Sequence, residues 1–240
     1  MMKKIANFLL ISLVSFLTIS SLVFLYISQN TYQPTEQALA FSKKAQKETA
    51  DFLFFESPDK TKATIIFYQG AFVEASSYAE MAVLLTQKGY DVYLLDSFLN
   101  LPILSHQKAL TLLPNIKQGP IYLAGHSMGG VVASLDAKKS KQIEGLILLA
   151  SYPSENTDLS RLDLSVLSIT SEHDKVLNSK NYREAQELLP PDTTYLTISG
   201  GNHAGFGDYG KQKGDGYATI SSSKQISKVG DAIDAFIQNN

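Results

Sequence analysis

Cysteine is absent from this chain of 240 residues. Its absence excludes a disulfide framework, a zinc site built from thiolates, a cysteine nucleophile and a lipid anchor attached through cysteine. An excess of charge is missing too: the formal net charge is −2, and no basic stripe suited to nucleic acid runs along the sequence. Internal repeats and low-complexity segments are also lacking. What remains is an ordinary globular composition, 44% apolar, and a length that fits one domain of about 200 residues plus an appendage.

The first segment of the chain is an apolar run preceded by two lysines. After Lys3 and Lys4, residues 5–27 contain no charged side chain, and a helix of this length spans a bilayer core of about 30 Å. We therefore expect residues 1–28 to form a single-pass membrane anchor. Because no Lys or Arg follows the run until Lys43, the positive-inside rule leaves the N-terminus in the cytoplasm and sends the rest of the chain outside.

Two other interpretations of this segment stay open. A cleaved signal sequence, which would give a secreted protein, normally has an apolar core of about 7–15 residues with a small-residue cleavage site directly after it. The nearest such site, Ala38-Leu39-Ala40, lies far beyond the apolar run. A buried helix of a soluble protein is the remaining alternative. Residues 29–50 are polar, with a mixed charged run from Lys43 to Glu48, and are predicted to form a tether.

From residue 51 onward, short apolar runs alternate with helical patterns. Continuous apolar runs are typical of a parallel sheet with helices on both faces, so residues 51–240 are predicted to form a doubly wound, mostly parallel α/β domain. The expected strands are Phe52–Phe55, Ala63–Tyr68, Val92–Leu95, Ile121–Ala124, Leu146–Ala150, Val166–Thr170 and Tyr195–Ile198. The expected helices are Ser76–Lys88, Ser105–Leu113, Gly130–Lys139, Lys180–Leu189 and Lys224–Ile237. In such a sheet, ligands bind beyond the carboxyl ends of the strands.

The motif that organises the domain is the pentapeptide Gly125-His126-Ser127-Met128-Gly129, which directly follows the apolar run Ile121–Ala124. A strand, a sharp turn and a helix in this order lift a serine hydroxyl clear of the sheet, and the flanking glycines permit the turn. Ser127 is therefore predicted to be a nucleophile. The alternative is an ordinary serine in a surface turn.

A serine hydroxyl is a weak nucleophile and needs a base, usually a histidine that a carboxylate holds. His203 follows the last expected strand, in a glycine-rich loop that can bring it back over Ser127. Of the other histidines, His106 falls in an expected helix, His126 lies inside the turn, and His173 comes too early for the order serine, acid, histidine. His203 is the predicted base. The alternative is a histidine that only packs its loop.

The acid is expected between Ser127 and His203, directly after a strand. Asp174, in the segment that follows Val166–Thr170, meets this condition, and Glu172 is its nearest rival. The remaining aspartates of this stretch are expected to be structural: Asp136, Asp158 and Asp163. Asp136 is expected to face out of the helix that follows Ser127.

A tetrahedral intermediate also needs hydrogen-bond donors aimed at its oxyanion. One is expected from the backbone N–H of Met128, the residue after the nucleophile. The other is expected from the loop after Ala63–Tyr68, with the N–H of Ala71 favoured and that of Phe72 second. No cofactor or metal ion is required. Gly205–Gly210 formally matches a dinucleotide fingerprint, but it follows a loop and precedes no helix.

Taken together, these features resemble the α/β-hydrolase fold, and more narrowly the small bacterial alpha/beta hydrolase family 5 type. The resemblance covers Asp51 to the C-terminus, and its most specific parts are Phe67-Tyr68-Gln69-Gly70, Gly125–Gly130 and Gly201–Gly210. It implies Ser127 as nucleophile, Asp174 as acid and His203 as base. One departure is Gln69-Gly70, where many relatives of the wider fold carry His-Gly.

Lids in this fold are commonly inserted after the strand that follows the nucleophile helix. Here only Ser151–Ser165 separates the two expected strands, which leaves no room for a cap domain and predicts an open site. We therefore predict a membrane-anchored, extracytoplasmic serine hydrolase, a carboxylesterase that cleaves small or exposed esters through an acyl-enzyme. The same triad could serve a peptidase, a thioesterase or an acyltransferase. Outside enzymes, the domain could be a non-catalytic surface binding module.

Overall fold

The computed structural model describes residues 2–240 and divides the chain after Thr31 into two units. The first unit is the helix α1 (Met2–Asn30). Its segment Leu9–Asn30, of 22 residues, is long and apolar enough to cross a membrane, and most of its large apolar side chains, such as Phe16 and Phe24, are exposed. By length and composition, this helix suits either a membrane anchor or a signal sequence.

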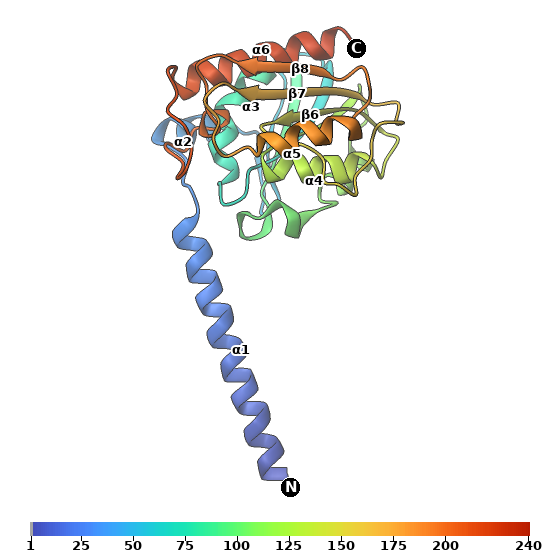
Figure 1. Cartoon of the computed structure of the whole chain (residues 1–240). Helices are drawn as coiled ribbons and strands as arrows, with labels where there is room; N and C mark the ends of the chain where they lie inside the picture. Colours follow the sequence, from blue (N-terminus) through green and yellow to red (C-terminus); the bar gives the residue numbers. More distant parts are fainter. Residues whose placement is uncertain (1) are drawn as a thin grey trace. The chain divides into compact units, whose positions relative to one another are not determined.

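The second unit, Tyr32–Asn240, is built on an eight-stranded, mostly parallel sheet (Figure 1). The strands are β1 (Lys47–Glu48), β2 (Phe52–Phe55), β3 (Ala63–Tyr68), β4 (Tyr90–Leu95), β5 (Ile121–His126), β6 (Ile143–Leu149), β7 (Ser165–Ser171) and β8 (Thr194–Ile198). Their order is β1-β2-β4-β3-β5-β6-β7-β8. β2 pairs antiparallel with β1 and β4, whereas all neighbours from β4 to β8 run parallel. The predicted doubly wound α/β domain is confirmed.

Helices cover both faces of the sheet (Figure 1). α3 and α6 pack on one face, and α4 packs on the other together with α5, whose Tyr182 hydroxyl lies 2.9 Å from the Ser168 hydroxyl of β7. The helices of this unit are α2 (Glu36–Ser42), α3 (Ala79–Gln87), α4 (Met128–Ala137), α5 (Ser179–Glu184) and α6 (Ser222–Gln238). Short 3₁₀ turns are η1 (Ala75–Tyr78), η2 (Phe98–Asn100), η3 (Pro102–Ser105), η4 (Ala109–Thr111), η5 (Leu113–Asn115), η6 (Ala185–Leu188) and η7 (Ala204–Phe206).

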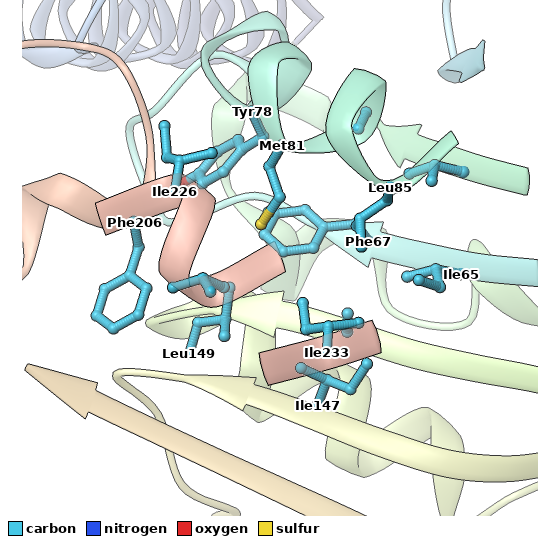
Figure 2. Close-up of a cluster of buried hydrophobic side chains, with 14 of the residues drawn as sticks. Ile65, Phe67, Tyr78, Met81, Leu85, Ile147, Leu149, Phe206, Ile226 and Ile233 are labelled. Atoms are coloured by element: carbon cyan, nitrogen blue, oxygen red, sulfur yellow. The ribbon is translucent and has the colours of Figure 1, made fainter. Parts of the chain in front are cut away.

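The strands read as continuous apolar runs because successive side chains enter cores on opposite faces of the sheet. In β3, Ile65 and Phe67 belong to the core beneath α3 and α6, whereas Ile66 belongs to the core beneath α4. Figure 2 shows the first core, in which Phe206 packs together with residues of α3, α6 and the central strands. Phe206 is fully buried, so the loop that carries His203 is tied to the core.

The connection between β4 and β5 differs from the sequence prediction. Three separate 3₁₀ turns replace the α-helix expected at Ser105–Leu113, because Gln107 within that range has a positive φ of 71°. Asp136 of α4 stabilises this irregular stretch. Its carboxylate accepts hydrogen bonds from the Tyr68 hydroxyl at 2.7 Å and the Gln107 N–H at 2.9 Å, while the Tyr68 hydroxyl accepts from the Ala109 N–H at 2.9 Å.

Asp136 itself is fully buried, so the expectation that it faces out of its helix is wrong. A carboxylate can be buried when strong donors surround it, and here the donors come from β3 and from the β4–β5 connection. Burial raises the pKa of the Asp136 carboxyl above its ordinary value. Its role in the structure is to hold the β4–β5 connection against α4.

Residues 32–50 also differ from the sequence prediction, which assigned residues 29–50 to a tether. They belong to the compact second unit. Thr35 caps α2 by accepting a hydrogen bond from the Ala38 N–H at 3.1 Å, and Ala38 is completely buried. β1 then pairs with β2. The polar sequence gives little sign of this docking, because its polar side chains bond to partners far along the chain, as Thr35 does to Asp208 and Gln37 to Glu80.

Candidate functional site

Ser127 is the single residue between β5 and α4, and the chain turns sharply there. Its φ of 52° and ψ of −122° lie outside the regions that residues with a side chain normally adopt. The Ser127 N–H donates to the Leu149 carbonyl at 2.9 Å, and the Ser127 carbonyl accepts from the Ser151 hydroxyl at 2.6 Å. Neighbouring strand ends therefore hold the strained turn in place. This is the strand–turn–helix context that the G-x-S-x-G motif predicts.

The glycines on either side of Ser127 let α4 lie directly against the strand ends. A Cβ atom on Gly125 would overlap the backbone of Gly129. One on Gly129 would overlap the carbonyl oxygens of Tyr68 and Gln69. A larger residue at either position would push the helix away from the sheet. The same close contact puts the beginning of α4 next to the loop that follows β3.

His203 and Asp174 lie side by side at the carboxyl end of the sheet. The His203 Nδ1 atom is 2.8 Å from the Asp174 Oδ2 atom, and both side chains are almost completely buried. The other carboxylate oxygen, Oδ1, accepts from the N–H groups of Val176 and Leu177, each at 2.8 Å. Because a carboxylate only accepts, the proton lies on Nδ1 and the imidazole presents Nε2 as an acceptor.

The Nε2 atom of His203 is buried and has no hydrogen-bond partner among the described residues. His203, Ser127 and Met128 line one pocket of about 380 Å³. The pocket has no carboxylate, lysine or arginine in its lining, and its apolar walls come from Ile103, Val131, Ala150, Tyr152, Val176 and Leu177. The connection from β6 to β7 forms part of the rim and contains no cap domain, as the sequence predicted.

The rival acids and histidines have other surroundings. Glu172 is exposed, and its carboxylate accepts hydrogen bonds from the Ser199 hydroxyl and the Gly200 N–H, both at 2.8 Å. The bond from Gly200, followed by that from Ser199, holds the pKa of Glu172 below its ordinary value. His106 is exposed, and the backbone N–H of His173 donates to the Gly201 carbonyl at 2.8 Å. Two further aspartates are exposed loop residues: Asp158 and Asp163.

His126 is the residue that sequence reasoning undervalued. Its ring centroid lies 4.5 Å from that of His203, and its Nδ1 atom is 2.8 Å from the hydroxyl of Tyr78. That hydroxyl accepts from the Gly70 N–H at 3.0 Å, so its own proton points to His126. Tyr78 thus joins the turn at Ser127 to the loop after β3. The sequence carries no signal for this contact, because η1 meets the turn only in the folded chain.

Of the two predicted oxyanion donors, one lines the pocket and the other does not. Met128 begins α4 and lines the pocket with Ser127. Ala71 lies outside the pocket lining, in the loop after β3, and within residues 2–240 its N–H donates to no other group. The N–H of Phe72, the second choice, donates to the Asn100 carbonyl at 2.7 Å. Of the two residues of this loop, only Ala71 has a free backbone donor.

The buried His126 makes the stability of the fold depend on pH. Burial, followed by the proximity of His203, lowers the pKa of His126 well below its ordinary value. The unfolded chain binds a proton at this histidine near its ordinary pKa of about 6.5, whereas the folded chain resists it. Below that pH, the unfolded state therefore binds more protons. The contribution to folding stability is complete above about pH 6.5 and is lost as the pH falls.

Because only the unfolded chain takes up this proton, we expect the free energy of unfolding to fall by up to about 1.4 kcal/mol per pH unit between about pH 6.5 and pH 5.5. In His126→Gln, whose amide cannot titrate, this part of the slope should disappear. Urea titrations of both proteins across this range measure the difference. Identical pH slopes for the two proteins would contradict the assignment of a neutral, buried His126.

Comparisons with known proteins give the family. The alpha/beta hydrolase family model matches residues 64–227. The esterase domain of a Rhodothermus marinus protein superposes with a TM-score of 0.60 and 13% identity, covering 78% of this chain and 92% of that one. Dienelactone hydrolase from Anabaena variabilis has a TM-score of 0.60 and 15% identity, with coverages of 78% and 90%.

A putative alpha/beta hydrolase from Agrobacterium tumefaciens has a TM-score of 0.59 and 16% identity, and the match covers 79% of this chain and 92% of that one. No curated protein matches the sequence. At these identities the solved structures show a common fold, and the family model adds the sequence match, which spans more than half of the chain. The resemblance seen in the sequence is therefore confirmed, and the chain belongs to the alpha/beta hydrolase family.

Proposed function

We propose that this protein is a carboxylesterase, with Ser127 as nucleophile, His203 as general base and Asp174 as the acid that orients the base. The observation that carries the proposal is the Nε2 atom of His203, buried without a partner in the pocket that Ser127 lines. A buried acceptor without a donor is costly to the fold unless function uses it. A serine hydroxyl is the donor that this nitrogen lacks.

The proposed reaction follows from the protons that these groups hold. Ser127 Oγ attacks the ester carbonyl while His203 Nε2 takes its proton, and the Asp174 carboxylate stabilises the imidazolium that forms. The backbone N–H groups of Met128 and Ala71 donate to the oxyanion, which also lies at the positive end of α4. His203 then protonates the leaving alcohol. Water, activated by the same histidine, hydrolyses the acyl-enzyme and restores Ser127.

Substitution of the proposed triad tests this mechanism. We expect Ser127→Ala to abolish hydrolysis of p-nitrophenyl acetate, and Asp174→Asn to lower kcat by about 10⁴-fold because the imidazole loses its orienting carboxylate. Glu172→Gln is the matched control, since Glu172 is an acidic neighbour that contacts Ser199 and Gly200 instead. Its kcat should stay close to that of the native protein. An active Ser127→Ala protein with a native circular dichroism spectrum would refute the proposed nucleophile.

The pocket limits the substrates that we propose. Its volume of about 380 Å³ lies at the lower end of ligand sites, and its walls carry apolar side chains such as Val131 and Leu177. Such a pocket favours a small, uncharged acyl group and offers no enclosing tunnel for a long chain. We infer that short esters, or ester groups that protrude from a larger molecule, are the substrates.

A series of p-nitrophenyl esters measures this limit. We expect kcat/KM to rise only among short acyl chains, between acetate and hexanoate, and to gain nothing further up to dodecanoate, because the added methylenes remain in water and gain no burial. A steady rise in kcat/KM from acetate to dodecanoate would show that the pocket continues beyond these walls.

We also propose that α1 remains as a single-pass anchor, with the hydrolase unit outside the cytoplasm. The length of its apolar segment Leu9–Asn30, and the two lysines that precede this segment, support the proposal. The small-residue site at Ala38–Ala40 falls in α2, where Ala38 is completely buried, so cleavage there would remove a docked part of the second unit.

Membrane extraction tests the anchor. The full-length chain should stay with bilayers through an alkaline carbonate wash, and its intact mass should include residues 1–28. External protease should digest the hydrolase unit on whole spheroplasts, whereas it should spare a cytoplasmic marker protein. Recovery of an active, soluble chain that begins at Phe41 would contradict the proposal.

A further inference from the structure

The first residues of the second unit, Tyr32–Thr35, reach two loops that are far apart in the sequence. One is the loop 70–74 after β3, which carries Ala71. The other is the stretch 203–213, which begins with His203. We call Tyr32–Thr35 the strap. Both of its targets belong to the site proposed above, and the contacts with each can be stated atom by atom.

The strap holds the loop 70–74 by its backbone. The Tyr32 N–H donates to the Phe72 carbonyl at 2.6 Å, and the Tyr32 carbonyl accepts from the Glu74 N–H at 3.2 Å. Phe72, whose carbonyl accepts the first of these bonds, has a φ of 59°. A bulky residue rarely adopts this left-handed conformation unless its surroundings impose it. The strap thus stabilises a strained turn directly beside Ala71.

The strap holds the histidine loop through Thr35 and Tyr32. The Thr35 N–H donates to the Asp208 carbonyl at 2.9 Å, and the Thr35 hydroxyl donates to the Asp208 carboxylate at 2.5 Å. The ring of Tyr32 lies 5.5 Å from that of the buried Tyr209, and its hydroxyl accepts from the Lys213 N–H at 3.1 Å. Asp208 lies only five residues after His203, so its position limits that of the base.

We propose that the strap is a positioning element of the active site, which fixes the loop of the Ala71 donor relative to the loop of the His203 base. This inference rests on the proposed function. The strap does not line the pocket, so its loss should leave substrate binding nearly unchanged. Misplacement of a catalytic group by about 1 Å can lower a rate about 10²-fold. The expected signature is therefore a lower kcat at nearly constant KM.

Substitutions at Thr35 in the full-length, detergent-solubilised protein test the proposal. Thr35→Val keeps the shape of the side chain and removes both the hydroxyl bond to Asp208 and the cap on the Ala38 N–H of α2. We expect kcat for p-nitrophenyl butyrate to fall about tenfold or more, with KM within about twofold. Thr35→Ser restores a hydroxyl and should recover most of kcat. Tyr32→Phe, which loses only the acceptor for the Lys213 N–H, should lower kcat in the same direction.

Gln37→Ala is the matched control on the same segment. Gln37 donates to Glu80 of α3 at 3.1 Å and to Ser223 of α6 at 2.8 Å, and so ties α2 to the body of the unit without touching either loop. Its loss should lower the Tm while leaving kcat close to the native value. If Thr35→Val lowers the Tm as much as Gln37→Ala does, and Thr35→Ser does not recover kcat, the strap only stabilises the fold and does not position the active site.

The outcomes separate the two proposals. Native kcat in both Thr35→Val and Tyr32→Phe, or a kcat lowered equally in Gln37→Ala, overturns the strap alone. Ester hydrolysis that is the same in the native protein and in Ser127→Ala overturns the proposed function, and the strap proposal falls with it. Loss of kcat in Thr35→Val with recovery in Thr35→Ser and no loss in Gln37→Ala supports the strap.

Discussion

The architecture of this protein depends on how closely α4 approaches the sheet. Gly125 and Gly129 leave no side chain between the helix and the ends of the central strands, and their carbonyl neighbours occupy the space that a Cβ would need. Because the helix begins so near the strand, Ser127 must turn with a positive φ. The same approach brings Met128 beside the loop after β3. One packing contact thus sets the serine, the helix N-terminus and the nearest loop together.

The turn at Ser127 is surrounded by two histidine rings and a single carboxylate. Two histidine rings lie with centroids 4.5 Å apart, and burial keeps His126 neutral. Its Nδ1 atom accepts from Tyr78, which in turn holds Gly70. A single carboxylate, Asp174, is bound to the other ring. In the proposed reaction the positive charge therefore forms only where a buried carboxylate compensates it, and the neutral neighbour adds no like-charge repulsion.

Much of the fold and the pairing of His203 with Asp174 could be anticipated from the sequence. The strands are local apolar runs, and the order of residues after successive parallel strands brings their ends together at one edge of the sheet. The elbow at Ser127 is also encoded locally. What could not be predicted depends on distant partners: the burial of Asp136 by Tyr68, the contact of Tyr78 with the turn at Ser127, and the docking of residues 32–50.

The central claim is that Ser127 is a nucleophile activated by His203, and covalent trapping tests it most directly. The full-length protein is treated with a fluorophosphonate, digested, and mapped by mass spectrometry. We predict a single adduct, on Ser127, whose formation slows by at least about 10³-fold in His203→Gln, because the hydroxyl then has no base. An adduct on another residue, or labelling of Ser127 at the native rate in His203→Gln, would contradict the account.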